Sequence, residues 1–320
     1  MKNVLLLSVG RRVELAQIFL GEVKKRNPKA RVFAVDFAPD HSAACRIVDR
    51  AYAAPQVTDS RYLEFVLGLC IENDIGLVIP TIDTELLVLA EYREMFDAIG
   101  VDLVISTLSF VRRCRDKRLT IDVFNELEIE SPLLYDRDKL SFPCFAKPYD
   151  GSCSVGAKKI EGIDQLTPDL LSDKKMIFME LIGFDYSEYT VDTYFDRQGT
   201  MRCLVPRKRI EVRAGEVSKG ITQKKYVYNH LLPRLQKVKG ARGCITIQVF
   251  VRDEPQNILG LEINPRFGGG FPLAYSAGAN FVGWLLDEYL LNKEVPFFDK
   301  WEENLLMLRY DAKVLVHESG

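Results

Sequence analysis

The sequence is short of the features that mark several large classes of protein. Lysine and arginine number 43 against 45 aspartate and glutamate residues, a net charge of -2, so the basic excess of a nucleic-acid-binding protein is missing. No apolar run reaches the roughly 20 residues of a membrane helix. NVLLLSV, at residues 3–9, is typical of a strand and is too short for the apolar part of a signal peptide. We therefore expect a cytoplasmic protein without nucleic-acid or membrane partners.

Paired cysteines and clustered histidines are also missing. The seven cysteines are odd in number and scattered, and none forms a C-x-x-C pair. The three histidines lie far apart, and no motif surrounds any of them. This pattern indicates neither a disulfide framework nor a zinc site. We assign no catalytic role to a histidine or a thiol, Cys153 included.

The first hundred residues lack a dinucleotide fingerprint but have a clear periodicity. Apolar segments such as NVLLLSVG, RVFAVDFAP and VDLVIS alternate with amphipathic helical stretches, which predicts a parallel, doubly wound sheet. SVGRRVEL contains one glycine instead of the G-x-G-x-x-G pattern. Ligands bind at strand ends in such sheets, so Arg11, Arg12, Asp83 and Glu85 either line a substrate pocket or, for the two acids, cap a helix.

Residues 260–271, GLEINPRFGGGF, place polar side chains at every second position and then three glycines. In a strand, Glu262, Asn264 and Arg266 share one face. The preceding segment CITIQVFV, at residues 244–251, is separated from ILGLEIN by the turn cluster RDEPQN. A hairpin centred near Pro255 sets Gln248 opposite Glu262 and Thr246 opposite Asn264. A slip of one residue would turn Gln248 to the other face.

This strand pair gathers oxygen ligands beside a guanidinium group. Mg²⁺ is usually held by a few protein oxygens together with substrate phosphates, and arginine matches phosphate oxygens with two parallel hydrogen bonds. The pattern therefore predicts a magnesium and phosphate site, followed by a flexible glycine loop. An ordinary half-solvated strand is the simpler interpretation of the same alternation.

A second glycine-rich segment lies upstream. FPCFAKPYDGSCSVGAKKI, at residues 142–160, is expected to form a strand that ends near Lys147, a turn of glycine and serine, and a second strand. Such turns expose backbone N–H groups, and a lysine adds a charge suited to phosphate. The string that defines a Walker loop is absent.

These motifs, in this order, resemble those of the ATP-grasp superfamily, in its branch related to the carbamoyl-phosphate synthase large subunit and the carboxylate–amine ligases. The resemblance runs from about residue 112 to 295, and the preceding part is similar to the domain that usually comes before it. It implies a Rossmann-like parallel sheet and then a two-lobed ATP-grasp fold with antiparallel sheets. The expected boundaries are 1–112 for the first domain, 113–185 for the small lobe and 186–320 for the large lobe.

The resemblance also implies roles for particular residues. Arg266 and Lys147 would contact the phosphates during catalysis, and Glu188 would hold the ribose, with Asp185 as its competitor because the spacing from the hinge is slightly long. The implied metal ligands are Gln248, Glu262 and Asn264. The remaining residues expected to bind the nucleotide are Lys117, Ser152, Ser154, Glu180, Leu181 and Ile182.

The segment VPRKRIEVRAGEVSKGITQKK, at residues 205–225, carries many cations within a strand-turn-strand pattern. Lysine and other charges commonly protect a solvated sheet edge, and the same charges suit an anionic substrate. Both interpretations stay open. Under the second interpretation we expect Arg209, Arg213 and Lys219 to meet substrate. Arg11 and Asp83, at strand ends of the first domain, are the other residues expected there.

The function implied is that of an ATP-dependent carboxylate–amine ligase, which forms a carbon–nitrogen bond through an acyl phosphate and releases ADP and phosphate. The expected cofactors are ATP and one or two Mg²⁺ ions, with Mn²⁺ as a substitute. The partners would be a small carboxylate and an amine, and a homodimer is left open. The alternatives are a kinase of carboxy or carbamate groups like carbamoyl-phosphate synthase, against which the chain is short, and a nucleotide-binding module without catalysis.

Overall fold

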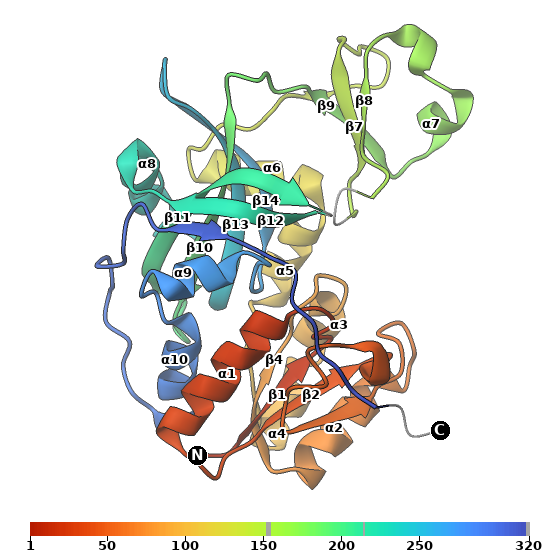
Figure 1. The fold of residues 1–320 in the computed structure, drawn as a ribbon. Helices are drawn as coiled ribbons and strands as arrows, with labels where there is room; N and C mark the ends of the chain where they lie inside the picture. The colour runs from red at the N-terminus through yellow and green to blue at the C-terminus, as the bar shows by residue number, and fades with distance from the viewer. Residues whose placement is uncertain (152–154, 214, 318–320) are drawn as a thin grey trace.

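The computed structural model describes residues 1–151, 155–213 and 215–317, and it contains three sheets (Figure 1). The first sheet is wholly parallel and confirms the predicted doubly wound domain. Its strands β1 and β4 are buried along almost their whole length because helices cover both faces. The strands, in the order β3-β2-β1-β4-β5, are β1 (Asn3–Leu7), β2 (Val32–Asp36), β3 (Arg50–Ala53), β4 (Ile75–Ile79) and β5 (Asp102–Leu103).

The direction of winding changes between β1 and β4, so the loops that follow these two strands meet at one edge of the sheet. Thr81 fixes this meeting point, since its hydroxyl lies 2.9 Å from the backbone oxygens of both Leu7 and Ser8. The helices of this domain are α1 (Val13–Arg26), α2 (Tyr62–Glu72), α3 (Leu86–Glu91) and α4 (Arg93–Ala98), with a 3-10 turn η1 (Pro39–His41).

The second sheet is small and antiparallel, with the strand order β6-β9-β7-β8. It forms a separate lobe at one side of the molecule, with its own cluster of buried residues around Cys144, Ala146 and Phe178 (Figure 1). Its elements are β6 (Leu134–Tyr135), β7 (Cys144–Pro148), β8 (Lys158–Ile160), β9 (Met176–Glu180), the 3-10 turn η2 (Ile163–Gln165) and α7 (Pro168–Ser172).

The third sheet has six antiparallel strands in the order β14-β13-β10-β11-β12-β15. The strands are β10 (Ser187–Phe195), β11 (Met201–Arg213), β12 (Glu216–Thr222), β13 (Gly243–Arg252), β14 (Asn257–Asn264) and β15 (Leu306–Leu308). The accompanying helices are α5 (Leu108–Arg115), α6 (Lys117–Glu126), α8 (Lys225–Leu235), α9 (Phe271–Ser276), α10 (Phe281–Leu285) and the π-helical turn η3 (Leu286–Leu290). The fold class predicted from the sequence is confirmed.

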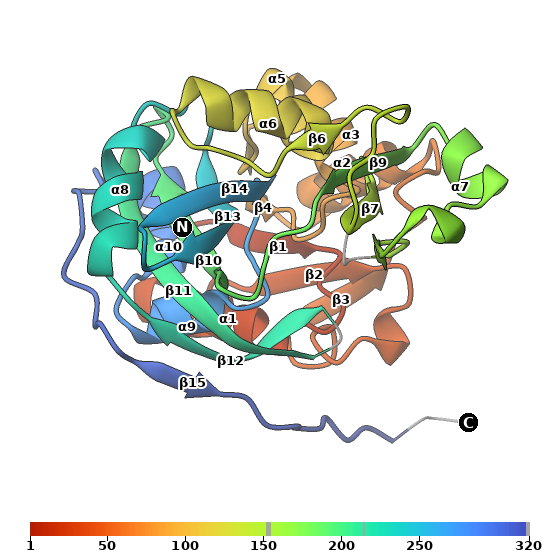
Figure 2. The ribbon, with the colours of Figure 1, turned by 90° about the horizontal axis from the view of Figure 1, so that it is seen from above.

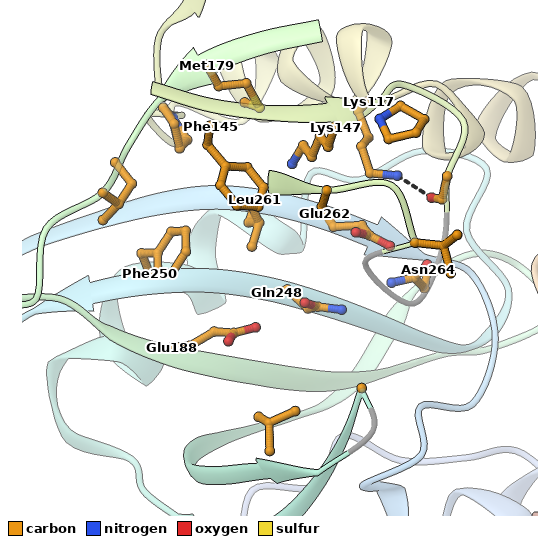
Figure 3. Close-up of a pocket in the computed structure, with 18 of the residues that line it drawn as sticks. Lys117, Phe145, Lys147, Met179, Glu188, Gln248, Phe250, Leu261, Glu262 and Asn264 are labelled. Atoms are coloured by element: carbon orange, nitrogen blue, oxygen red, sulfur yellow. Dashed lines mark hydrogen bonds between the residues drawn. The ribbon is translucent and has the colours of Figure 1, made fainter. Parts of the chain in front are cut away.

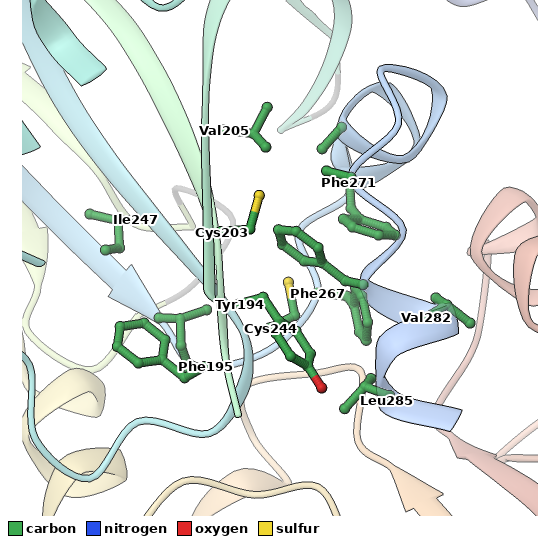
Figure 4. Packing of buried hydrophobic residues seen from close by; sticks show 14 of the residues in the cluster. Tyr194, Phe195, Cys203, Val205, Cys244, Ile247, Phe267, Phe271, Val282 and Leu285 are labelled. Atoms are coloured by element: carbon green, nitrogen blue, oxygen red, sulfur yellow. The ribbon is translucent and has the colours of Figure 1, made fainter. Parts of the chain in front are cut away.

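The main core lies between the large sheet and helices α9 and α10. Aromatic side chains such as Tyr194, Phe267 and Phe271 fill it (Figure 4). Helix α1 packs on the outside of α9 and α10, and Arg26 at its end lies 2.7 Å from Asp287. The N-terminal domain is therefore fixed against the large lobe. Helices α5 and α6 pack against β14 (Figure 2).

The hairpin β13–β14 has the predicted register. Thr246 pairs with Asn264, and Gln248 pairs with Glu262. Beyond this point the register shifts, because Val249 pairs with Gly260 and leaves Leu261 without a partner strand residue. Strict alternation places Leu261 on the face away from Glu262, and this expectation is wrong: both residues line the same cavity.

Two expected absences can be examined in the described part of the chain. No helix in it is long and apolar enough to cross a bilayer. The six cysteines that it includes are free and buried, whereas Cys153 lies outside the described residues.

Candidate active site

A cavity of about 400 Å³ lies between the small and the large lobe. Figure 3 shows side chains from both lobes pointing into it. One residue of the N-terminal domain, Asp83, also reaches its wall. The residues of the sequence-based prediction that line the cavity are Asp83, Lys117, Lys147, Glu180, Leu181, Ile182, Glu188, Arg209, Gln248, Glu262, Asn264 and Arg266.

The predicted metal ligands lie together at the charged end of this cavity. Gln248 on β13 and Glu262 and Asn264 on β14 face the same side of the sheet (Figure 3). The set offers one carboxylate and two amide oxygens. In the described ranges, no group of three or more His, Cys, Asp and Glu side chains could hold a metal ion by itself. This chemistry fits Mg²⁺ that takes its other ligands from phosphates and water, and it does not fit a zinc cage.

Two lysines lie on the opposite wall. Lys147 on β7 is 7% exposed, and burial lowers the pKa of its ammonium group to about 8, against the opposing attraction of Glu262. Lys117, at the start of α6, is also buried and donates to the backbone oxygen of Gly151 at 2.5 Å. A buried ammonium group loses favourable hydration, and a phosphate beside it would offset this cost.

Arg266 and Asp83 form an ion pair of 2.7 Å across the boundary between the large lobe and the N-terminal domain. Asp83 belongs to the loop after β4, and that loop is held by the buried carboxylate of Glu85. The carboxylate accepts from the backbone N–H groups of Thr81 and Ile82 and from the hydroxyl of Ser8. Burial raises the pKa of Glu85. The predicted phosphate-binding arginine is therefore positioned by the switch-point loop of the first sheet.

Glu188, the residue predicted to hold the ribose, lines the cavity and accepts a hydrogen bond from Arg209. Arg209 also donates to the side-chain oxygen of Gln248 at 3.2 Å. Burial raises the pKa of Glu188. Asp185, its competitor, is exposed, forms an ion pair with Arg252 at 3.2 Å and does not line the cavity. The geometry favours Glu188.

The other end of the cavity is apolar, and the sequence analysis missed its residues. Phe145, Met179, Phe250 and Leu261 surround it (Figure 3). A signal existed for two of them, because Phe145 is two positions from Lys147 on β7, and Phe250 is two positions from Gln248 on β13. Residues two apart in a strand share a face.

The remaining predicted residues lie elsewhere. Lys219 is half exposed and forms a 2.6 Å ion pair with Glu211. It lines neither the cavity between the lobes nor the cavity beside it, which agrees with a solvated strand. Arg11 and Arg213 line a second cavity next to the first. Ser152 and Ser154 lie outside the described residues.

The three glycines at 268–270 were expected to form a flexible loop. This expectation needs correction, because close packing also requires glycine there. A Cβ atom on Gly270 would lie 2.3 Å from Nη1 of Arg207, and one on Gly268 would lie 2.9 Å from the side chain of Thr246. Arg207 is 1% exposed and bonds to Asp192 at 2.7 Å. Its two terminal nitrogens have no hydrogen-bond partner among the residues that the structure describes. The glycines are needed because the loop lies directly on buried side chains.

Two antiparallel lobes around a cavity with an apolar and a charged end are the architecture of the two-lobed ATP-grasp fold. Residues 4–104 match the family described as PylC-like, N-terminal domain. Residues 172–309 match the family described as ATP-grasp in the biosynthetic pathway with Ter operon. The ATP-grasp match confirms the resemblance seen in the sequence.

Solved structures share this fold at low sequence identity. The biotin carboxylase domain of the 2-oxoglutarate carboxylase of Hydrogenobacter thermophilus superposes with a TM-score of 0.74 at 14% identity, over 95% of this chain and 73% of that chain. The L-amino acid ligase of Bacillus licheniformis gives a TM-score of 0.67 at 15% identity, over 91% of this chain and 74% of that chain. The N5-carboxyaminoimidazole synthetase of Staphylococcus aureus gives 0.68 at 13%, over 92% and 78%. No curated protein matches the sequence.

Proposed function

We propose that the protein is an ATP-dependent carboxylate–amine ligase that works through an acyl phosphate. One observation carries the proposal. Gln248, Glu262 and Asn264 converge with Lys147 and Arg266 at the charged end of a cavity whose other end is apolar. Such a cavity suits a ligand with a flat apolar head and a polyanionic tail, and ATP is such a ligand.

The nucleotide would lie along the cavity with its adenine among the apolar side chains. The backbone of Glu180 to Ile182 borders this end, and Glu188 stands between it and the charged end. The Glu188 carboxylate would turn away from Arg209 and accept hydrogen bonds from the ribose hydroxyls. It would hold the sugar in this way. The phosphates would then reach Lys117 and Lys147. An anion beside these ammonium groups would lower the free-energy cost of burying their charge.

Gln248, Glu262 and Asn264 would hold the magnesium. Bound there, the ion would supply positive charge between the terminal phosphates and hold them in line for transfer. The presence of a single carboxylate among the ligands suits a site completed by phosphate oxygens. Mn²⁺ as a substitute and a second ion stay predictions.

The chemistry needs no nucleophilic side chain. A carboxylate oxygen of the first substrate attacks the γ-phosphorus, and the bond from that phosphorus to the bridging oxygen of ADP breaks. The amine nitrogen of the second substrate then attacks the acyl carbon, phosphate leaves with its oxygen, and the amine proton passes to water. Arg266 would leave Asp83 and bind the transferred phosphoryl group instead. Positioning and charge would supply most of the rate acceleration.

The comparisons support this proposal without identifying the substrates. The structure of the Hydrogenobacter thermophilus domain is described with MgADP and bicarbonate, and one structure of the Staphylococcus aureus synthetase is described with ADP. A third similar structure is that of an amino acid ligase. The Hydrogenobacter thermophilus domain is described as a dimer, and a homodimer of the present chain stays a prediction.

The test uses hydroxylamine in place of the unknown amine. The full chain is incubated with ATP, Mg²⁺, hydroxylamine and pools of amino acids or of di- and tricarboxylic acids, and phosphate and hydroxamate are both measured. An acyl phosphate reacts with hydroxylamine, so we expect phosphate and hydroxamate in equal amounts with at least one pool. The variant Glu262→Gln is expected to lose roughly a hundredfold or more of this turnover.

Three results would count against the proposal. Phosphate release with bicarbonate alone would favour the formation of carboxyphosphate. Tight binding of ADP without turnover in any pool would favour a binding module. Hydroxamate formation that Glu262→Gln does not change would remove the site.

A further inference from the structure

A second cavity, of about 570 Å³, lies beside the nucleotide cavity. Parts of the chain that are far apart in sequence form its walls. They are the first turn of α1, the β11–β12 hairpin, the glycine loop and the C-terminal segment 307–314. Figure 1 shows this segment running from the large lobe past the start of α1.

The two cavities share elements at their boundary. On the β11–β12 hairpin, Val212 and Gly215 line the nucleotide cavity, whereas Arg213 and Glu216 line the second one. Arg12 lines the second cavity and interacts electrostatically with Arg266 and Asp83, which line the first. It donates to the backbone oxygen of Phe267 at 2.9 Å. The second cavity therefore adjoins the end of the first at which Arg266 would receive the transferred phosphoryl group.

The second cavity has an excess of positive charge. Its lining contains five cationic side chains and three carboxylates. Arg309 engages Glu14 at 2.7 Å and Glu216 at 3.2 Å, and Arg213 pairs with Asp311 at 2.5 Å. The carboxylates are thus already paired. The cations that remain are Arg11, Arg12 and Lys313.

Arg11 and Arg12 are the cations best placed to bind a ligand. The Arg11 side chain makes no hydrogen bond or ion pair with any residue that the structure describes, and Arg12 has a single carbonyl partner. Burial, with a further contribution from Arg266, lowers the pKa of Arg12 to about 10. A bound anion would offset this cost. No side chain caps α1, whose first turn lines the same cavity, and free N–H groups there favour negative charge.

The position in the fold points the same way. Arg11 and Arg12 follow β1, at the switch point where the strand order of the parallel sheet reverses. Open α/β sheets bind ligands outside the carboxyl ends of their strands at this point. The G-x-G-x-x-G fingerprint of a dinucleotide site is absent, so the loop is available for another anion.

The outer wall is held in place by the chain itself. Strand β15 pairs with β12, where Leu308 lies opposite Lys219. Directly after it, Arg309 donates to the backbone oxygen of Gly269 at 2.7 Å. Through Arg309 the C-terminal segment therefore connects the glycine loop, α1 and the β11–β12 hairpin, and it forms one wall of the cavity.

We propose that this second cavity is the subsite for the co-substrate of the ligation, and that it takes a small molecule with a carboxylate or phosphate-ester group anchored by Arg11 and Arg12. The identity of the occupant as a co-substrate rests on the proposed function. The anion site itself rests only on the cavity, its unpaired charge and its place at the switch point.

The experiment titrates two probes, succinate and glycerol 3-phosphate, into the full chain by calorimetry, with and without saturating MgADP. We expect at least one probe to bind under both conditions. Comparison of the affinities for the two probes shows whether the site prefers a carboxylate or a phosphate ester. Arg11→Glu should weaken that probe by about tenfold or more and leave MgADP binding unchanged. Lys29→Glu makes the same charge change at an exposed lysine far from the cavity, and it should bind the probe as the wild type does.

The proposal would be overturned if neither probe bound, if Arg11→Glu bound the probe as tightly as Lys29→Glu, or if MgADP displaced the probe. Failure of MgADP to bind, with probe binding still dependent on Arg11, would reject the proposed function and leave the anion site standing. Thermal melting of both variants verifies that they are folded.

Discussion

At the scale of single residues, the unusual feature of the charged end is the buried ammonium group of Lys147. Burial lowers its pKa to about 8, and neighbouring Lys117 adds to the shift. The charged form is thus present below about pH 8 and is lost above it. Because the proposed role of Lys147 is to attract phosphate oxygens, nucleotide binding should depend on this titration.

We predict that the affinity for MgADP falls as the pH rises through 8, by up to about tenfold per pH unit. Lys147→Arg keeps its charge throughout this range, so its affinity should stay nearly constant between pH 7 and 9. Calorimetric titrations at several pH values measure both profiles. Parallel profiles of wild type and variant would show that another group titrates.

The sequence predicts those site residues whose geometry is local. Glu262, Asn264 and Arg266 share a face because a strand has a period of two, and no knowledge of the rest of the fold is needed. The ion pair of Arg266 with Asp83 could not be predicted, because the two residues are 183 positions apart and meet only when two domains pack. The burial of Arg207 was missed for a different reason, because a basic run is typical of a solvated surface.

At the scale of elements, the β13–β14 hairpin and the glycine loop decide the shape of the site. The register of the hairpin was predictable from its turn cluster and from the pairing of polar with polar side chains. The shift beyond Gln248 was not, because one extra residue in a strand leaves no mark in the alternation of so short a segment. That shift places Leu261 in the cavity beside Glu262.

The glycine loop gives a prediction about stability. In Gly270→Ala the new Cβ would lie 2.3 Å from Arg207, whose guanidinium is buried and held by Asp192. The loop or the arginine must shift, so we expect a loss of about 1–3 kcal/mol in the free energy of unfolding. Denaturant unfolding measures it.

The matched control is Gly68→Ala. Gly68 lies inside α2 with no atom within 4 Å of the new Cβ, and alanine is the better helix former by about 1 kcal/mol. This variant should be as stable as the wild type or more so. Equal stability of Gly270→Ala and wild type would contradict the close packing of the loop.

At the scale of the whole molecule, three sheets meet at the charged end of the cavity between the lobes. The small lobe brings Lys147, the large lobe brings Glu262 and Arg266, and the parallel domain brings Asp83. The switch-point loops of the parallel sheet thus serve both cavities.

The parallel sheet was predictable from its local periodicity, whereas the fold of the two antiparallel lobes was implied by the resemblance of the motifs to those of a known superfamily. The placement of the parts was not predictable, since it depends on contacts such as that between Arg26 and Asp287. The role of the C-terminal segment as a wall was missed as well, because a short polar-ended strand carries no signal about what it covers. The exact domain boundaries stay predictions.

The central claim is that Gln248, Glu262 and Asn264 bind the phosphates of a nucleotide through a magnesium ion. The most direct measurement is the calorimetric titration of ADP into the full chain with and without Mg²⁺, for the wild type and for Glu262→Gln. We predict that Mg²⁺ strengthens ADP binding by about tenfold or more in the wild type and has little effect in the variant. The same affinity for ADP with and without Mg²⁺, or an undiminished effect of Mg²⁺ in Glu262→Gln, would contradict the claim.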